Sequence, residues 1–277
     1  LTIEDLVALE RWDEAIARLQ GRVEVNANDL HAHLKLAECY VGAGRNTAAL
    51  DEFFFVSDSY CDDGFYDKAI ALLSKIARLA PGDSQFEGRL RRAQQLKDLE
   101  HRRTLAMEGL MAAQEEKDPL ARLSLIEAQI LWRGIQSSDF VSRLSGEQLR
   151  RLFESSVLSE PQRGTILAER GSQVEQLYIF ASGAAEALCD LGDGHPVHLK
   201  SFEAGDIIGD RSLFEHQPWP ATYRTTVAGQ LFRLDPAGLE KALLGNADPR
   251  ALIDALRARR SDHDVAAAVR KLVASPA

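Results

Sequence analysis

The hydrophobic pattern of the chain changes at Pro161, and this change constrains the fold more than any other feature. Before Pro161, apolar residues recur with the spacing of amphipathic helices. After it come short apolar runs separated by glycines and turns, such as QLYIFASG and VHLKSFEAGD, which are typical of the short strands of a barrel or sandwich. Helical spacing returns at PAGLEKALL. We therefore expect a two-domain α + β protein in which helices precede and follow a β-barrel.

These patterns divide the 277 residues into three parts. We expect helical repeats over residues 1–83, a connector helix over 84–118 and a β-barrel domain over 119–277. The barrel strands would occupy about residues 160–235, and closing helices would occupy 236–275. A further helix is expected over about Leu120–Gln136, after the connector ends near Asp118-Pro119.

The first part contains an internal repeat. A small alanine is followed four residues later by a bulky apolar residue in three places: Ala15 and Leu19, Ala49 and Phe53, Ala69 and Leu73. The first two alanines lie 34 residues apart, and the third fits if the helix from Arg45 to Cys61 serves two units. Pro81-Gly82 would close the last unit. This part resembles the tetratricopeptide repeat family, which implies a curved surface that binds a protein partner. A plain helical bundle without a partner is the alternative.

Charge and composition exclude several classes of function. The net charge is −9, most of it from residues 1–83, and no domain-sized basic stripe exists for binding nucleic acid. The RLRR cluster at Arg89–Arg92 is expected to be a solvated helix face, and Asp58, Asp62, Asp63 and Asp67 a solvated turn. No apolar run approaches ~18 residues, so no membrane insertion is expected. Three scattered cysteines and a start without a signal segment indicate a trimmed cytoplasmic protein.

The segment ILAERGSQVEQLYIFASGAAEAL and the later stretch FEAGDIIGDRSLF carry the most specific motif. Together they resemble the cyclic-nucleotide-binding domain family over about residues 135–277. The resemblance implies a jelly-roll-like barrel that turns tightly at its structural glycines, Gly171, Gly183 and Gly205. It also implies a phosphate-binding cassette and helices that move when a ligand binds.

The resemblance places a ligand site in two segments: Gly209, Asp210, Arg211, Ser212 and Leu213, then Tyr223, Arg224 and Thr225. In the family, a Gly-Glu pair binds the ribose, and an arginine binds the cyclic phosphate. Here the pair ends in an aspartate, one methylene shorter, and Tyr223 stands where the arginine is expected. A one-residue shift along a strand reverses a side chain, so Arg224 would serve only if a bulge turned it inward.

Two interpretations of this domain stay open. Trp219, between Pro218 and Pro220, would either plug the pocket or form a wall beside a base, and Arg211 offers a replacement charge for a phosphate. The domain is therefore either a degenerate protein-interaction module or a divergent sensor of a cyclic mono- or dinucleotide.

No enzyme is expected. The sequence contains no phosphate-binding loop, nucleophile elbow, zinc-protease or kinase motif. His31 and His33 lie on different faces of a helix, and the residues around Cys189 and His195 form a turn, so no metal site is expected. We predict a non-catalytic, bacterial-type signalling adaptor. The alternatives are a true cyclic-nucleotide receptor that regulates the partner, a structural scaffold, and a regulatory subunit of a separate enzyme.

Overall fold

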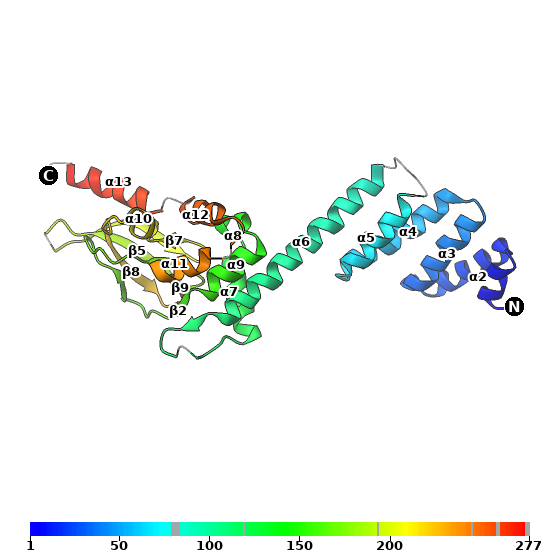
Figure 1. Ribbon diagram of the computed structural model, residues 1–277, viewed down its shortest axis with the longest axis horizontal. Coiled ribbons are helices and arrows are strands. Elements are labelled where there is room, and N and C mark those ends of the chain that lie inside the picture. The colour runs from blue at the N-terminus through cyan, green and yellow to red at the C-terminus, as the bar shows by residue number, and fades with distance from the viewer. Residues whose placement is uncertain (79–83, 119, 193, 245, 259–260, 275–277) are drawn as a thin grey trace. The chain divides into compact units, whose positions relative to one another are not determined.

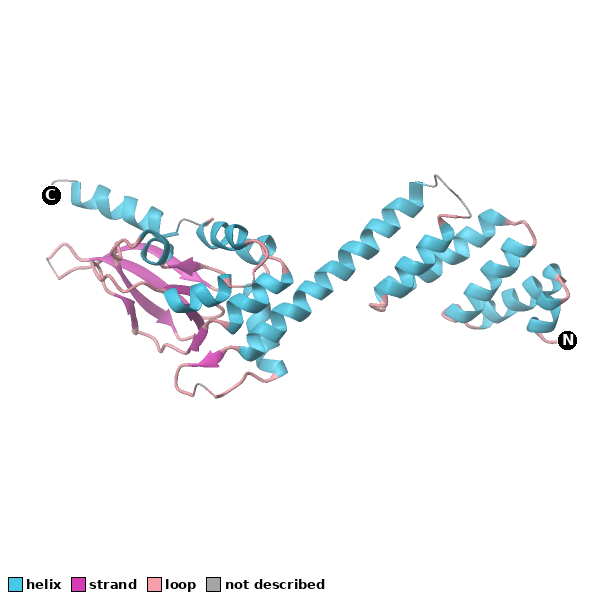
Figure 2. Ribbon diagram, viewed as in Figure 1, coloured by secondary structure: helices cyan, strands magenta, loops and turns pink. Residues whose placement is uncertain are grey.

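The structure, a computed structural model, describes residues 1–78, 84–118, 120–192, 194–244, 246–258 and 261–274 (Figure 1). Contacts between residues divide the chain into two units, Leu1–His101 and Arg102–Ala277. The first unit is helical, and the second combines helices with two β-sheets (Figure 2). The predicted boundaries at 83 and 118 stay predictions, and the predicted turn at Pro81-Gly82 lies outside the described residues.

The first unit is a series of helices that pack mainly against their neighbours in sequence. They are α1 (Ile3–Ala8), α2 (Trp12–Val25), α3 (Leu30–Gly42), α4 (Asn46–Asp62), α5 (Tyr66–Ile76) and the first part of α6 (Ser84–Ala112). The three alanines and the three bulky residues of the sequence repeat are all buried in one core. Helix α4 contacts both α3 and α5. Helices α2 and α3 pack closely at Gly42, because a β-carbon there would lie 2.8 Å from the Trp12 ring.

The aspartates and arginines that were expected to be solvated are exposed or half-buried, and several of them also form ion pairs. Three aspartates of α4 and α5 meet three cations of α6: Asp58 and Arg89 at 3.0 Å, Asp62 and Arg92 at 3.4 Å, Asp67 and Lys97 at 2.5 Å. The second and third cations lie three and eight residues after the first, so all three share one face of the helix. These side chains stay at least partly exposed, so the solvated surface that was expected also carries ion pairs between helices, which the local sequence did not predict.

The second unit begins with the last part of α6 and continues through β1 (Gln114–Glu115), α7 (Leu125–Ile135), α8 (Asp139–Arg143) and α9 (Gly146–Glu154). Helix α6 ends at Ala112 and not near 118, because Gln114–Glu115 leave the helix to pair in parallel with the next strand. Tertiary pairing thus overrides the high helix propensity of this segment. Helix α7 starts later than the predicted Leu120, because Ser124 and Glu127 form a capping box.

The remaining strands are β2 (Val157–Ser159), β3 (Ile166–Ala168), β4 (Leu177–Phe180), β5 (Ala184–Cys189), β6 (Val197–Glu203), β7 (Ile207–Ile208), β8 (Thr222–Val227) and β9 (Leu231–Leu234). They form a five-stranded sheet, β1-β2-β9-β4-β7, and a four-stranded sheet, β3-β8-β5-β6. The β-rich domain flanked by helices is confirmed, but its strands do not form a closed barrel: they form two sheets, neither of which closes on itself. Two open sheets explain the short strands and glycine turns equally well, since both features only require that the chain reverse often.

Strand β4 lies between two cores, which explains its uninterrupted apolar run. Leu177 and Ile179 face the helices, whereas Tyr178 and Phe180 face the space between the sheets. The strand is therefore buried on both sides. Helix α10 (Asp210–Glu215) lies between β7 and β8, and β9 is followed by α11 (Pro236–Leu243), α12 (Pro249–Arg257) and α13 (Ser261–Ala274). Helix α13 packs against α10, β6 and β7.

Candidate functional site

The predicted ligand cassette begins at Gly209, which joins β7 to α10. Gly209 has a φ of 94°, in the left-handed region that glycine adopts without strain. A β-carbon here would lie 2.0 Å from the carbonyl oxygen of Gln176 and 2.9 Å from the Trp219 ring. Glycine is therefore needed both for the turn and for the close approach of these neighbours.

Tyr223 and Arg224 point to opposite faces of β8. The Tyr223 side chain is fully buried between the sheets. The Arg224 guanidinium lies on the other face, where it donates to Oε1 of Glu186 on β5 at 2.7 and 3.1 Å. Side chains alternate along a strand, so only one of the two can face the interior. Arg224 is not a ligand group for the space between the sheets.

Aromatic side chains fill that space. Trp219 packs edge-on against Tyr223 with ring centroids 5.0 Å apart, and Phe202 contacts Tyr223 at 5.7 Å. The indole nitrogen of Trp219 donates to the carbonyl oxygen of Val174 at 2.8 Å. A hydrogen-bonded, fully buried indole is held in place. Trp219 also lines a cavity of about 350 Å³ beside β3, so both predictions for this residue stay predictions.

A carboxyl group from α13 completes the site. Asp262 is fully buried, and its Oδ2 accepts from the Gly209 backbone N–H at 2.7 Å. Its Oδ1 accepts from the Tyr223 hydroxyl, also at 2.7 Å. One carboxyl group therefore occupies a position between the backbone turn of the cassette and the tyrosine that replaces the expected arginine.

Asp210 lies beside Asp262, so the site holds two buried carboxyl groups. Their side chains interact with each other. Burial raises the pKa of Asp210. Burial and the neighbouring Asp210 charge raise the pKa of Asp262 to about 7. Burial and the Asp262 carboxylate raise the pKa of Tyr223, which stays a protonated donor. Two adjacent carboxyl groups in a poorly solvated site favour sharing one proton.

The other predicted ligand residues have separate roles. The Ser212 hydroxyl donates to the carbonyl oxygen of Val174 at 2.7 Å, and Leu213 packs in the core beside the helices. Arg211 lies 3.6 Å from Glu215 on the same helix, and Thr225 is buried. Of the predicted set, Gly209, Asp210 and Tyr223 interact directly with the Asp262 side chain.

The three predicted structural glycines all occupy left-handed turns, with φ of 82° at Gly171, 80° at Gly183 and 88° at Gly205. Gly183 is also sterically confined, because a β-carbon there would lie 2.8 Å from the carbonyl oxygen of Val227. These positions fix where the strands turn and do not contact Asp262.

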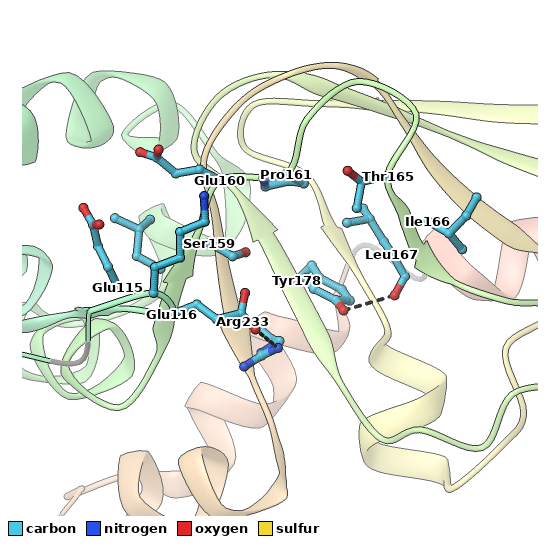
Figure 3. Close-up of a pocket in the computed structure, with 12 residues that line it drawn as sticks. Glu115, Glu116, Ser159, Glu160, Pro161, Thr165, Ile166, Leu167, Tyr178 and Arg233 are labelled. Carbon is cyan, nitrogen blue, oxygen red and sulfur yellow. Dashed lines mark hydrogen bonds and ion pairs between the residues drawn. The ribbon is translucent and has the colours of Figure 1, made fainter.

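A separate cavity of about 260 Å³ lies beside β2 and β3 (Figure 3). Three glutamates line it, and one of them, Glu116, pairs with Arg233 at 2.6 Å. Figure 3 shows the Tyr178 hydroxyl bonded to the carbonyl oxygen of Leu167 at its other side. None of the predicted ligand residues lines this cavity. Two cations, Lys117 and Arg233, line it as well, so its charge is mixed.

Comparison with known proteins identifies the domain that carries this site. Residues 160–246 match the family model described as the cyclic nucleotide-binding domain. The matched segment contains the Gly209 turn and Tyr223 but ends before α12 and α13. No comparison identifies tetratricopeptide repeats in the helical unit.

Two curated proteins are similar to this domain. Potassium channel KOR2 of Oryza sativa subsp. japonica is 29% identical over 121 residues, which are 44% of this chain and 16% of the channel. The anaerobic regulatory protein of Bacillus subtilis (strain 168) is 29% identical over 107 residues, 38% of this chain and 45% of that protein. The chain thus spans less than half the length of these relatives.

Solved structures give similar partial matches. A triple mutant of the regulatory subunit of a cAMP-independent protein kinase A from Trypanosoma brucei, bound to cAMP, aligns with a TM-score of 0.42 and 21% identity over 52% of this chain and 49% of its own. The N-terminal domain of a transcriptional regulator from Streptomyces coelicolor A3(2) aligns with a TM-score of 0.41 and 24% identity over 47% of this chain and 94% of its own.

Sequence reasoning missed Asp262, which lies 53 residues from Gly209. The segment SDHD resembles an ordinary acidic first turn of a helix. Nothing local marks one of its aspartates as buried, so the sequence offered no signal.

Metal-binding clusters and membrane-spanning helices are both absent from the described residues. These residues contain no group of three or more histidine, cysteine, aspartate or glutamate side chains arranged to hold a metal ion. Within the same described ranges, no helix is both long and apolar enough to cross a membrane.

Proposed function

We propose that this chain is a non-catalytic signalling adaptor whose cyclic nucleotide-binding domain acts through protein contacts. The observation that carries the proposal is the contact of Tyr223 with Asp262, in the position where the family would place a cationic group facing a phosphate. A cyclic phosphate entering this space would meet two buried carboxyl groups in place of an arginine. Like charges at short range and low solvation strongly disfavour such a complex.

In this proposal the helical unit binds a protein partner as tetratricopeptide-like repeats do. Its support is the stacking of each helix on the next and the burial of the alanine and bulky residues in one core. A series of helices stacked in this way presents an extended surface to peptides or helices of other proteins. The acidic balance of residues 1–83 favours a partner with a basic surface.

The test is calorimetric titration of the full chain with cyclic AMP, cyclic GMP and cyclic dinucleotides. We expect no saturable binding up to millimolar nucleotide. A dissociation constant in the micromolar range for any of them would overturn the proposal. The matched variants are Arg224→Gln, which removes an arginine from the outer face, and Arg211→Gln, which removes the arginine of α10. If the wild-type chain bound a nucleotide, the variant that lost binding would identify the cationic group involved.

The second candidate function is a true receptor. It is favoured by the Gly209 turn, whose backbone N–H already donates to a carboxylate oxygen. A nucleotide that displaced Asp262 would find this donor in place. In the same titration, Asp262→Ala would then bind more tightly than the wild-type chain, because the competing internal anion is gone.

A further inference from the structure

Among the residues that the structure describes, helix α13 contacts the rest of its unit through a buried carboxyl group, surface ion pairs and an apolar face. The carboxyl group is that of Asp262, which contacts Gly209 and Tyr223. At the surface, His263 pairs with Glu215 of α10 at 2.9 Å, and Asp264 pairs with Lys200 of β6 at 3.0 Å. The apolar face consists of Val265, Val269 and Leu272, which pack into the core between the sheets.

We propose that the Asp262 carboxyl group is a built-in ligand of the cassette, and that α13 is a latch which this group holds closed. The inference rests on the proposed function only in treating Gly209–Glu215 as the ligand cassette of the domain. The contact has the form of a bound anion, because both carboxyl oxygens accept from donors that belong to the cassette turn and to β8.

The Asp262 contact also has an unfavourable part, because it brings this carboxyl group close to that of Asp210. Asp210 is buried beside Asp262, and within the described residues its Oδ1 has no hydrogen-bond donor. When both carboxyl groups are ionised, two negative charges share a poorly solvated site. The closed helix therefore depends on a proton that the pair retains and that is released when the helix leaves.

The charged and titratable groups around Asp262 come from each element packed against it. Helix α10 contributes Asp210, Arg211 and Glu215, and β8 contributes Tyr223. On α13 itself, His263 and Asp264 pair outward with Glu215 and Lys200. The experiment must therefore separate the His263–Glu215 contact from the carboxyl pair.

The direction of the pH effect follows from proton linkage. The pKa of Asp262 is about 7 in the closed state, against its ordinary value of 3.8 when the helix leaves. Between these values, opening releases a proton, so the opening constant rises with pH and levels off above about 7. With these two values, raising the pH from 6 to 8 increases the opening constant roughly tenfold.

Hydrogen exchange of the full chain, without nucleotide, tests the latch. We expect amides of α13 to open about tenfold more often at pH 8 than at pH 6, after correction for intrinsic exchange, while those of β4 and β5 change little. Asp210→Asn should remove this difference and keep α13 protected at both pH values. Asp254→Asn on α12 is the matched control, because it removes an exposed carboxylate and should leave the pH step unchanged.

Two further variants decide the outcome. His263→Gln should retain the pH step, because the carboxyl pair is intact. Asp262→Ala should leave α13 unprotected at both pH values. A pH step that persists in Asp210→Asn, or that disappears in His263→Gln, would overturn the proposal even if Asp262→Ala failed to fold. Because no nucleotide is added, failure of the latch is distinct from failure of the proposed function.

Discussion

At the scale of single residues, Gly209 carries two constraints that can be separated experimentally. It adopts a left-handed backbone conformation, and it allows the Gln176 carbonyl and the Trp219 ring to approach. Gly171 carries the first constraint alone, with a φ of 82° and no atom within 4 Å of the position that a β-carbon would take. The two glycines therefore form a matched pair in the same domain.

Gly209→Ala is expected to lower the free energy of unfolding by more than about 3 kcal/mol, because it adds a steric clash to backbone strain. Gly171→Ala should cost only about 1–2 kcal/mol, the strain of a left-handed residue with a side chain. Urea denaturation of both variants measures the difference. Equal losses would show that the Gln176 carbonyl and the Trp219 ring move aside freely, contrary to close packing around the cassette turn.

At the scale of elements, the sequence supported those assignments that depend on local pattern. The run QLYIF predicts a strand, and its burial on both faces explains why no polar residue interrupts it. The glycine turns at Gly171, Gly183 and Gly205 were equally readable, because only glycine enters a left-handed turn freely. The inward position of Tyr223 followed from strand alternation once the motif was aligned.

What the sequence could not predict depends on distant contacts. The end of α6 at Ala112 is set by pairing of Gln114–Glu115 with β2, about 40 residues away. The openness of the two sheets depends on which strand edges meet, and local pattern does not encode this. The carboxyl pair joins Asp210, which the cassette motif marks, to Asp262, which no local pattern distinguishes.

Helix α6 offers a test of tertiary packing against intrinsic propensity. A β-carbon at Gly109 would lie 2.4 Å from the carbonyl oxygen of Arg150 on α9, whereas Gly88 on the same helix has nothing within 4 Å. Gly88→Ala should stabilise its unit by about 0.5–1 kcal/mol, because alanine is the better helix former. Gly109→Ala should destabilise its unit by about 1–3 kcal/mol. Thermal unfolding followed by circular dichroism measures both, and a stabilising Gly109→Ala would contradict the packing of α6 against α9.

At the scale of the whole molecule, the pH dependence of the free energy of unfolding sums over all titrating groups. The carboxyl groups with shifted pKa values act in two different ranges of pH. Hydrogen bonds to backbone or side-chain donors lower the pKa of Asp5, Asp29, Glu127 and Glu147. These groups stabilise the fold above their unfolded pKa, and that contribution is lost only as the pH falls through still lower values. Asp262 acts in the opposite direction, because its pKa is raised to about 7.

The free energy of unfolding should therefore fall as the pH rises from 5 to 7.5. Over this range the folded state holds a proton at Asp262 that the unfolded state has already lost, and the loss of stability is on the order of 2–4 kcal/mol. Above about pH 7 the folded state releases the proton too, so the curve should flatten.

Urea titrations at half-unit steps of pH measure this curve, with Asp210→Asn as the comparison. In that variant the removal of the neighbouring charge lowers the pKa of Asp262, so the decline should be shallower and end at a lower pH. A wild-type curve that is flat or rises over the same range would show that the two carboxyl groups are not buried together in solution.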